Sequence, residues 1–274
     1  MKLSARMTAS AALLLTLAGT VGCTKLKARD ELVKGVQAFK SGKYEEAVDY
    51  FQKSVALDPS SPVSHLYLAT AYSYQVVPDL TTPENLAIAQ KALDGFNAVL
   101  AQNPNDLDAL RQIASIDRNI HKYDEAKATE LKIISLDDHD SDANYTLGYI
   151  NWAQAFKNTG DTLGAAGLQY DGQGDVKKSK AVCEKLVAQN TDLINDALKY
   201  LQQSVNINPN NDQAMAILNL TYRLKADLEC GDDAARKADL AKADEWVQRG
   251  MGARRANEAA KEKIAAHGGI TPQQ

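Results

Sequence analysis

The sequence predicts an all-α protein in which about five helix pairs stack into an α-solenoid. Two observations lead to this prediction. Hydrophobic residues make up 45% of the 274 residues but aromatic residues only 6%, and Ala and Leu supply most of the apolar side chains, as in closely packed helices. In addition, a spacing of 34 residues recurs along the chain, which is typical of proteins built from repeated helix pairs.

Two series of small residues carry this spacing. In the first half of the candidate units the small residues lie 34, 45 and 34 positions apart, and they are Gly35, Ala69, Ala114 and Gly148. In the second half the alanines follow at steps of 45, 34, 71 and 46, and they are Ala47, Ala92, Ala126, Ala197 and Ala243. The basic unit is therefore 34 residues long, and the longer steps reflect residues inserted in the middle of a unit.

The residues around these positions resemble the tetratricopeptide repeat (TPR), a pair of antiparallel helices called A and B. In the first unit the pattern consists of Gly35, Tyr44, Ala47, Phe51 and Pro59. The resemblance covers about 28–250 and implies five units. Their expected bounds are about 28–61, 62–106, 107–140, 141–211 and 212–250.

Two units depart from the pattern. In the third, Glu130 replaces the large apolar residue and Asp138 replaces the proline, and in the fifth Asn219 stands where a small residue is expected. The pattern has a physical basis. A small residue on helix A lets helix B approach closely, a proline ends helix B, and each unit alone leaves an apolar face exposed, so the units must stack.

The inserted residues all fall between helices A and B, in the second, fourth and fifth units. In the second unit, Thr82 followed by Pro83 predicts the N-terminal cap of a helix. In the fourth unit, residues 158–175 contain five glycines and are expected to form a loop, whereas residues 176–190 form an amphipathic helical run. Because A-to-B turns of successive units lie along one edge of a solenoid, we expect all three insertions at that edge.

Cys183 and Cys230 lie in two neighbouring insertions. In an oxidising compartment such a pair suggests a disulfide; the alternative is two separate buried thiols. Their expected proximity favours the bridge, which Cα atoms more than about 7 Å apart would exclude.

The N-terminus has the features of an export signal. Lys2 and Arg6 precede an apolar run, and small residues lead to Cys23. Thr20-Val21-Gly22 before Cys23 resembles the lipobox of bacterial lipoproteins, although Leu is usual at the position of Thr20. The resemblance implies a signal peptide at 1–22 and a lipidated N-terminus with a short linker at 23–27; the alternative is an ordinary secretory signal that leaves Cys23 free. A lipoprotein of this kind faces the periplasm of a bacterial envelope, with the outer membrane favoured over the inner.

At the other end, residues 251–274 are expected to form a C-terminal capping helix followed by a disordered tail after Gly268-Gly269. A polar terminal helix would cover the last apolar face of the array.

The sequence contains no pattern typical of an enzyme or a cofactor site. Nucleotide-binding and nucleophile motifs are absent, so we expect no catalysis and no cofactor. The acidic run 137–140 falls where two units join and is interpreted as a polar turn, and 170–175 is interpreted as a glycine-rich loop, so no metal site is predicted. The formal net charge of −4 argues against a nucleic-acid partner.

The TPR resemblance implies a concave groove, lined by the A helices, that binds a peptide or protein segment. The residues it places there are Tyr67, Tyr74, Arg111, Arg118, Tyr145, Tyr149, Trp152 and Arg223. Tyr, Trp and Arg are enriched where binding energy concentrates; the alternative is that the tyrosines pack against the insertions as core. Leu32 and Val36 stand where a clamp for a C-terminal carboxylate needs polar groups, which disfavours that mode.

We therefore expect a lipid-anchored, non-catalytic scaffold for protein–protein interaction. One alternative is a pilotin-like assembly factor for a pilus, a secretin or an outer-membrane protein. A second is a periplasmic binding module for a small molecule or glycan, in which the insertions with Trp152 and Tyr170 close a pocket.

Overall fold

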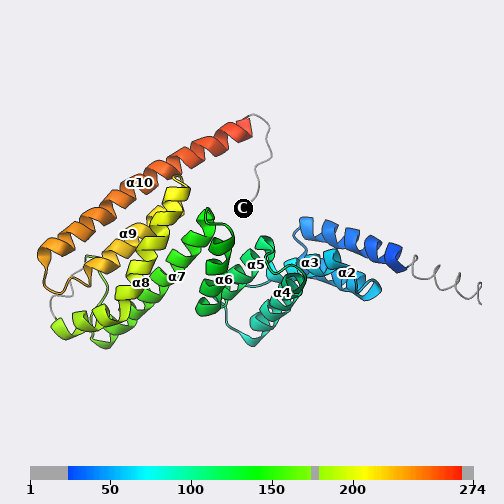
Figure 1. Ribbon diagram of the computed structural model, residues 1–274, viewed down its shortest axis with the longest axis horizontal. Coiled ribbons are helices and arrows are strands. Elements are labelled where there is room, and N and C mark those ends of the chain that lie inside the picture. Colours follow the sequence, from blue (N-terminus) through cyan, green and yellow to red (C-terminus); the bar gives the residue numbers. More distant parts are fainter. Residues whose placement is uncertain (1–23, 174–178, 267–274) are drawn as a thin grey trace, which may run out of the picture. The chain divides into compact units, whose positions relative to one another are not determined.

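The computed structural model describes residues 24–173 and 179–266. Within these residues every regular element is a helix (Figure 1), which confirms the all-α prediction. The predicted signal peptide, Cys23 and the tail from 267 onward lie outside the described residues. The chain forms two compact units, Met1–Ala126 and Lys127–Gln274, and each is described by itself.

The first compact unit consists of helix pairs with short, capped connections. A helix over 24–40 is followed by α2 (Tyr44–Leu57), α3 (Pro62–Ser73), α4 (Pro83–Gln102) and α5 (Leu107–Asn119). The hydroxyl of Thr82 accepts a hydrogen bond from the backbone N–H of Asn85, and Pro83 is the first helical residue. The predicted helix start at Thr82 is therefore confirmed.

Close packing in the first unit depends on its small residues. A Cβ atom added to Gly35 would lie 2.4 Å from the ring of Phe51 on α2, and one added to Gly95 would lie 2.5 Å from the Cβ of Ala69 on α3. Phe51 is fully buried, and burial of such a side chain contributes roughly 1.5–3 kcal/mol. Helices A and B therefore meet at positions of the repeat pattern, with Gly35 against Phe51.

The second compact unit contains longer helices. The boundary between the units falls within α6 (Tyr123–Leu136), which is followed by α7 (Ser141–Ala165), α8 (Lys180–Ile207), α9 (Asp212–Ala226) and α10 (Asp233–Ala266). Here too a glycine permits close approach, since a Cβ on Gly148 would lie 2.4 Å from Cγ of Leu201.

The expected loop over 158–175 is wrong in its first half, because α7 continues to Ala165. Buried polar side chains hold this extension against α8. Asn190 donates hydrogen bonds to the carbonyl oxygen of Ala155 (3.2 Å) and to the hydroxyl of Thr159 (3.0 Å), and Asn158 donates to the side chain of Asn190 (3.0 Å). The insertion therefore lengthens the α7–α8 hairpin, because packing against α8 outweighs the low helix propensity of Gly160 and Gly164.

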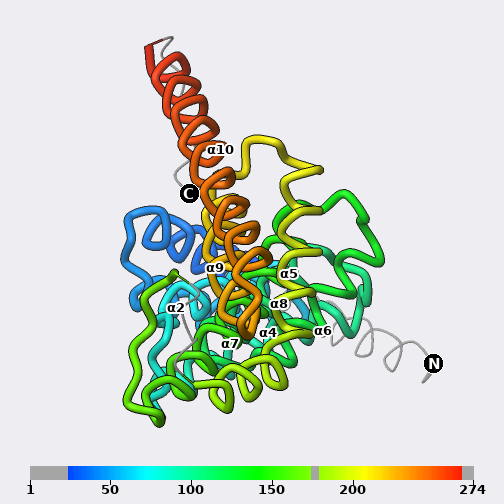
Figure 2. The backbone as a smooth tube through the Cα atoms, turned by 90° about the vertical axis from the view of Figure 1, so that its left-hand side faces the viewer, coloured from blue at the N-terminus to red at the C-terminus, as the bar shows by residue number. Residues whose placement is uncertain are grey.

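The predicted boundary between the last helix B and a separate capping helix at 251 does not appear. Helix α10 continues without interruption through Gly250 and Gly252, and Figure 2 shows its end running beyond α9. Ala253 is buried and Asn257 donates a hydrogen bond to the carbonyl oxygen of Asn210 (2.9 Å), but every residue of 258–266 is exposed. Only the start of the segment therefore covers the last helix pair.

Within each compact unit the A-to-B turns are neighbours, as expected for stacked pairs. In the first, the backbone N–H of Asp79 in the insertion donates to the carbonyl oxygen of Asn119, which precedes the next such turn (2.9 Å). In the second, the insertions that hold Cys183 and Cys230 meet. In the described part of the chain, no helix combines the length and apolar character needed to cross a membrane.

Candidate partner-binding surfaces

Four aromatic rings follow one another along α7, and we call them the aromatic row: Tyr145, Tyr149, Trp152 and Phe156. The ring centroids of successive members lie 6.1, 5.6 and 5.6 Å apart, because spacings of four, three and four residues share one face of a helix. The structure thus brings three predicted groove residues together. It adds Phe156, which the sequence analysis missed although its spacing from Trp152 signals it.

The aromatic row is partly core and partly surface. Tyr145 and Trp152 pack against the buried cluster around Leu201 and Leu218, whereas Phe156 is 44% exposed. The indole Nε1 of Trp152 is buried without a hydrogen-bond partner in the described residues. Tyr145 and Trp152 therefore contribute in part to the core, as the second interpretation expects, and the groove interpretation stays a prediction.

Arg223 on α9, another predicted groove residue, is already engaged. Its guanidinium donates to the side chain of Asn219 (2.9 Å), to the carbonyl oxygen of Gly172 (3.1 Å) and to a carboxylate oxygen of Asp244 on α10 (2.9 Å). The side chain is 23% exposed. Arg223 therefore holds the loop after α7 and the last helix together.

The loop after α7 places a fifth ring beside the aromatic row. Tyr170 contacts Phe156 edge-on, with centroids 5.6 Å apart, and packs against buried residues of two apolar clusters that include Leu163 and Leu224. Burial, and then the charge of Asp227, raises the pKa of the Tyr170 phenol to about 12. Tyr170 therefore stays neutral at physiological pH.

The predicted groove residues of the first compact unit lie on two neighbouring A helices. On α3, Tyr67 stacks on Phe51 with centroids 5.4 Å apart, and it adjoins exposed Val63 and Leu66 on a helix that carries no Asp, Glu, Lys or Arg. Tyr74, just after α3, is separate from Tyr67 in its contacts, because it packs against Phe39 and Tyr44; those centroids lie 4.9 and 5.2 Å away.

Helix α5 contributes the two predicted arginines. Arg111 forms an ion pair with Asp108 (3.4 Å), and Arg118 is half-buried. A hydrogen bond from Ser73 to Gln112 (3.5 Å) connects α3 to α5. The first unit therefore presents an apolar A helix beside one that carries two arginines and two aspartates.

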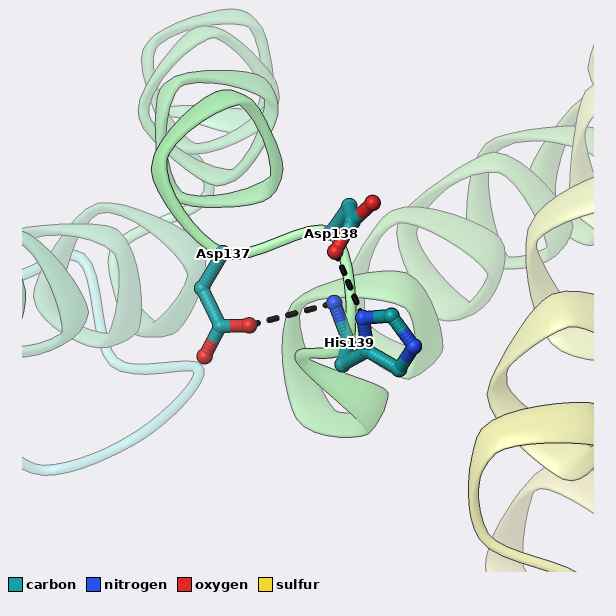
Figure 3. Close-up of side chains that lie close together, drawn as sticks. All are labelled: Asp137, Asp138 and His139. Carbon is teal, nitrogen blue, oxygen red and sulfur yellow. Dashed lines mark hydrogen bonds and ion pairs between the residues drawn. The ribbon is translucent and has the colours of Figure 1, made fainter.

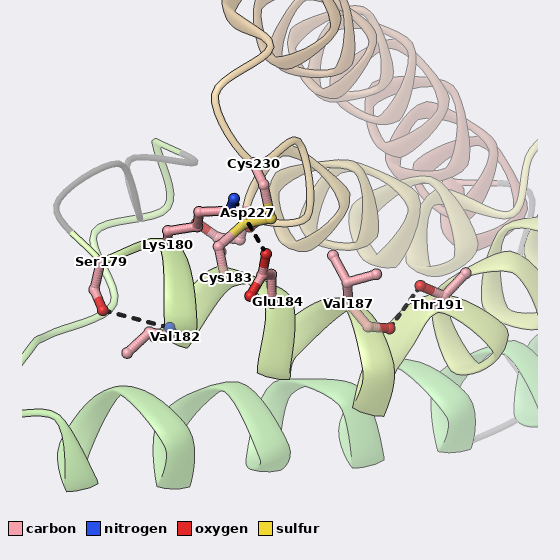
Figure 4. The surroundings of a disulfide bond; sticks show 9 residues. All are labelled: Ser179, Lys180, Val182, Cys183, Glu184, Val187, Thr191, Asp227 and Cys230. Carbon is pink, nitrogen blue, oxygen red and sulfur yellow. Dashed lines mark hydrogen bonds and ion pairs between the residues drawn. A yellow bond between two sulfur atoms is a disulfide. The ribbon is translucent and has the colours of Figure 1, made fainter.

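Cys183 and Cys230 form a disulfide (Figure 4), with Cα atoms 5.7 Å apart. Cys183 is buried in the first turn of α8, and Cys230 is exposed in the turn between α9 and α10. The bridge therefore connects the inserted segments of the fourth and fifth repeats.

The acidic turn after α6 brings Asp137, Asp138 and His139 together (Figure 3). A carboxylate oxygen of Asp137 accepts from the backbone N–H of His139 (3.1 Å), and Asp138 contacts the imidazole Nδ1. Asp140 then caps α7, accepting from the N–H of Ala143 (2.8 Å). These contacts agree with the interpretation of 137–140 as a polar turn.

Comparison with known proteins agrees with the geometry. Residues 33–61 match the tetratricopeptide repeat family. A solved structure of MamA 41-end from Desulfovibrio magneticus RS-1 has 17% identity and a TM-score of 0.54, covering 84% of this chain and 96% of that chain. A second, titled "Crystal structure of MamA protein", has 14% identity and a TM-score of 0.52, covering 90% and 98%. No curated protein matches the sequence significantly.

These similarities define an all-α solenoid of helix pairs as the class of fold. The match at residues 33–61 lies in the first helix pair, and the solved structures share the fold of the chain.

Proposed function

We propose that this protein is a non-catalytic scaffold for protein–protein interaction, held by a lipid on Cys23 at the periplasmic face of a bacterial envelope membrane. The partner is a peptide or protein segment that binds along the A helices. The aromatic row carries this proposal, because four rings with exposed outer edges lie along one A helix. Tyr and Trp concentrate binding energy at interfaces since each buries a large area with few rotatable bonds.

The contacts of the row favour binding over a purely structural role. A core aromatic side chain is normally enclosed on all sides, yet Phe156 is 44% exposed and Tyr145, Tyr149 and Trp152 are intermediate. Exposed apolar residues on α3, including Val63 and Leu66, supply a second such surface in the first compact unit.

The test replaces Tyr149 with Ala and uses Tyr200→Ala as the matched control. Tyr200 is also half-buried, but it lies on helix B α8 under Lys199 and away from the aromatic row. With each protein as bait in solubilised envelopes, the amount of one identified partner is measured. We expect Tyr149→Ala to lower capture about tenfold, as loss of an interface aromatic does, with Tyr200→Ala near wild type.

The helical content and thermal unfolding of both variants are measured alongside. Retained capture by Tyr149→Ala would contradict the proposal, and a large loss of stability would assign Tyr149 to the core instead.

A further inference from the structure

We propose that residues 168–173 act as an internal ligand on the second unit's binding surface, and that the partner is a peptide segment that takes their place. Its chemistry follows from theirs: an aromatic side chain replaces Tyr170, and a carbonyl or carboxylate oxygen two residues later replaces the carbonyl oxygen of Gly172. This inference rests on the proposed function of the aromatic row.

The first contact of this loop continues the aromatic row. The four rings of the row all come from α7, whereas the next ring, that of Tyr170, comes from the loop and meets Phe156 at an interplanar angle of 88°. Edge-on contact is a favoured geometry for aromatic pairs. Tyr170 also packs against the buried cluster of Ala155, Ile194 and Leu224. The loop therefore places its one aromatic side chain where a bound peptide would place an anchor.

The second contact engages the main chain of the loop. Arg223 donates to the carbonyl oxygen of Gly172 (3.1 Å), and Arg236 of α10 donates to that of Gln173 (2.9 Å). Two arginines on different helices thus hold consecutive carbonyl groups. Gly172 is buried with φ of 69°, and a Cβ there would lie within 3.9 Å of both Tyr170 and Arg223. An anchored ring together with carbonyl groups held by charged donors is a combination suited to binding a peptide segment.

The loop makes these contacts with few residues, so a competing segment can replace it. In the described part of the loop, Ala166, Gly167, Gln169, Asp171 and Gln173 are exposed. The contacts of residues 168–173 therefore come from the side chains of Leu168 and Tyr170 and from two main-chain carbonyl groups. A partner with the same groups binds only the fraction of molecules from which the loop has moved away, which lowers its apparent affinity by that fraction.

The ion pairs of Arg223 and Arg236 also bear on the charge expected of the partner. Arg223 is also paired with Asp244 (2.9 Å), and Arg236 lies near Asp233 (3.6 Å). The positive charge at each arginine is thus partly balanced, so a neutral carbonyl suffices as the acceptor and a strongly acidic partner is not required. The aromatic side chain then decides which segments bind.

The experiment uses Tyr170→Ala and a labelled probe peptide, acetyl-Leu-Gln-Tyr-Asp-Gly-Gln-amide, which copies residues 168–173. Binding is followed by fluorescence anisotropy. We expect Tyr170→Ala to bind the probe about tenfold more tightly than the wild type, because the internal competitor loses its anchor. A peptide with Ala in place of Tyr should bind neither protein, and adding Arg223→Ala to Tyr170→Ala should weaken binding of the probe.

A second variant covers the case in which Tyr170→Ala does not fold. Arg236→Ala releases the carbonyl of Gln173 without touching the aromatic row. It is tested with a shortened probe, acetyl-Leu-Gln-Tyr-Asp-Gly-amide, which does not use the Arg236 donor. Arg254→Ala, whose arginine pairs with Glu258 on the exposed part of α10, is its control. Arg236→Ala should tighten binding of the shortened probe and Arg254→Ala should not. The inference is overturned if Tyr170→Ala and Arg236→Ala fold but bind their probes no more tightly than the wild type does, or if no protein binds a probe.

The two proposals fail separately. If no variant binds the probe while Tyr149→Ala still lowers partner capture, only the internal ligand is refuted. If Tyr149→Ala leaves capture unchanged, the binding role of the aromatic row is refuted whatever the probe shows.

Discussion

Two glycines at the same repeat position show how a single residue sets the distance between helices. Gly35 faces Phe51 and Gly148 faces Leu201, and in each case an added Cβ would lie 2.4 Å from the opposite side chain. Atoms cannot approach that closely, so any other residue would push the two helices apart or displace the partner side chain. The glycine requirement therefore reflects close approach of helices, not backbone conformation.

Asp227, the residue after α9, is the clearest case of a residue whose charge opposes folding. Its carboxyl is 3% exposed and one oxygen is buried without a hydrogen-bond partner in the described residues. Burial, with a smaller effect of the Asp171 charge, raises its pKa from 3.8 to about 7. The folded protein therefore keeps a proton on Asp227 that the unfolded chain has lost.

The predicted consequence concerns pH. Because the pKa of Asp227 is about 7 in the folded protein and 3.8 in the unfolded chain, the contribution of this carboxyl to the stability of the fold is greatest below pH 3.8. This stability is lost as the pH rises from there through about 7. We expect Asp227→Asn to unfold at higher denaturant than wild type at pH 8 and to lack most of the decline in stability between pH 5 and pH 8. Urea unfolding followed by tryptophan fluorescence measures this, because both tryptophans, Trp152 and Trp246, lie in the second unit.

The exposed Asp192 on α8 provides the control, since Asp192→Asn should leave the pH profile as in wild type. If Asp227→Asn has the same dependence of stability on pH as the wild type, water or movement of the chain solvates the Asp227 carboxylate in the wild type.

At the scale of elements, the long α7–α8 hairpin depends on fixed connections at its far end. The disulfide joins the start of α8 to the turn after α9, across a sequence separation of 47 residues. Arg223 and Lys225 tie α9 to α10 through Asp244 and Asp239. These connections stabilise the insertions against each other.

We predict that replacing both Cys183 and Cys230 with Ser lowers the free energy of unfolding of the second unit by about 2–4 kcal/mol, since the bridge restricts a long loop in the unfolded chain. Urea unfolding by tryptophan fluorescence should show the shift. A reducing agent should bring the wild type to the same midpoint and leave the double variant unchanged. If the reduced and oxidised wild types unfold alike, the bridge contributes nothing to stability.

At the scale of the whole molecule, the lipid that we propose on Cys23 is tested by where the protein is found in the cell. We predict that Cys23→Ser moves the protein from the membrane fraction to the soluble periplasmic fraction, because the acyl chains provide the membrane affinity and the described helices include none able to span a bilayer. Fractionation with immunoblotting measures this. Ser4→Ala, within the predicted signal but outside the lipobox, is the control, and membrane association of Cys23→Ser would refute the anchor.

The helix pairs and their register were determined by the sequence itself. The spacing of Gly35, Tyr44, Ala47, Phe51 and Pro59 acts within one unit, so short-range packing and helix termination suffice to predict it. The bounds of α3 and α4 follow from Ser61-Pro62 and Thr82-Pro83 in the same way. Even the aromatic row on α7 was partly predictable, because its members share one helix face.

Other features follow from contacts between residues that are far apart in the sequence, and only the tertiary structure shows them. Asn158 is helical because it bonds Asn190, 32 residues away, and Arg223 is engaged because it meets Gly172, 51 residues away. Local propensity favours a loop at Asn158, and it gives no information about the partner of Arg223. Such contacts depend on how neighbouring pairs stack, so the positions of Phe156, Tyr170 and Arg223 at one surface followed from folding, not from spacing.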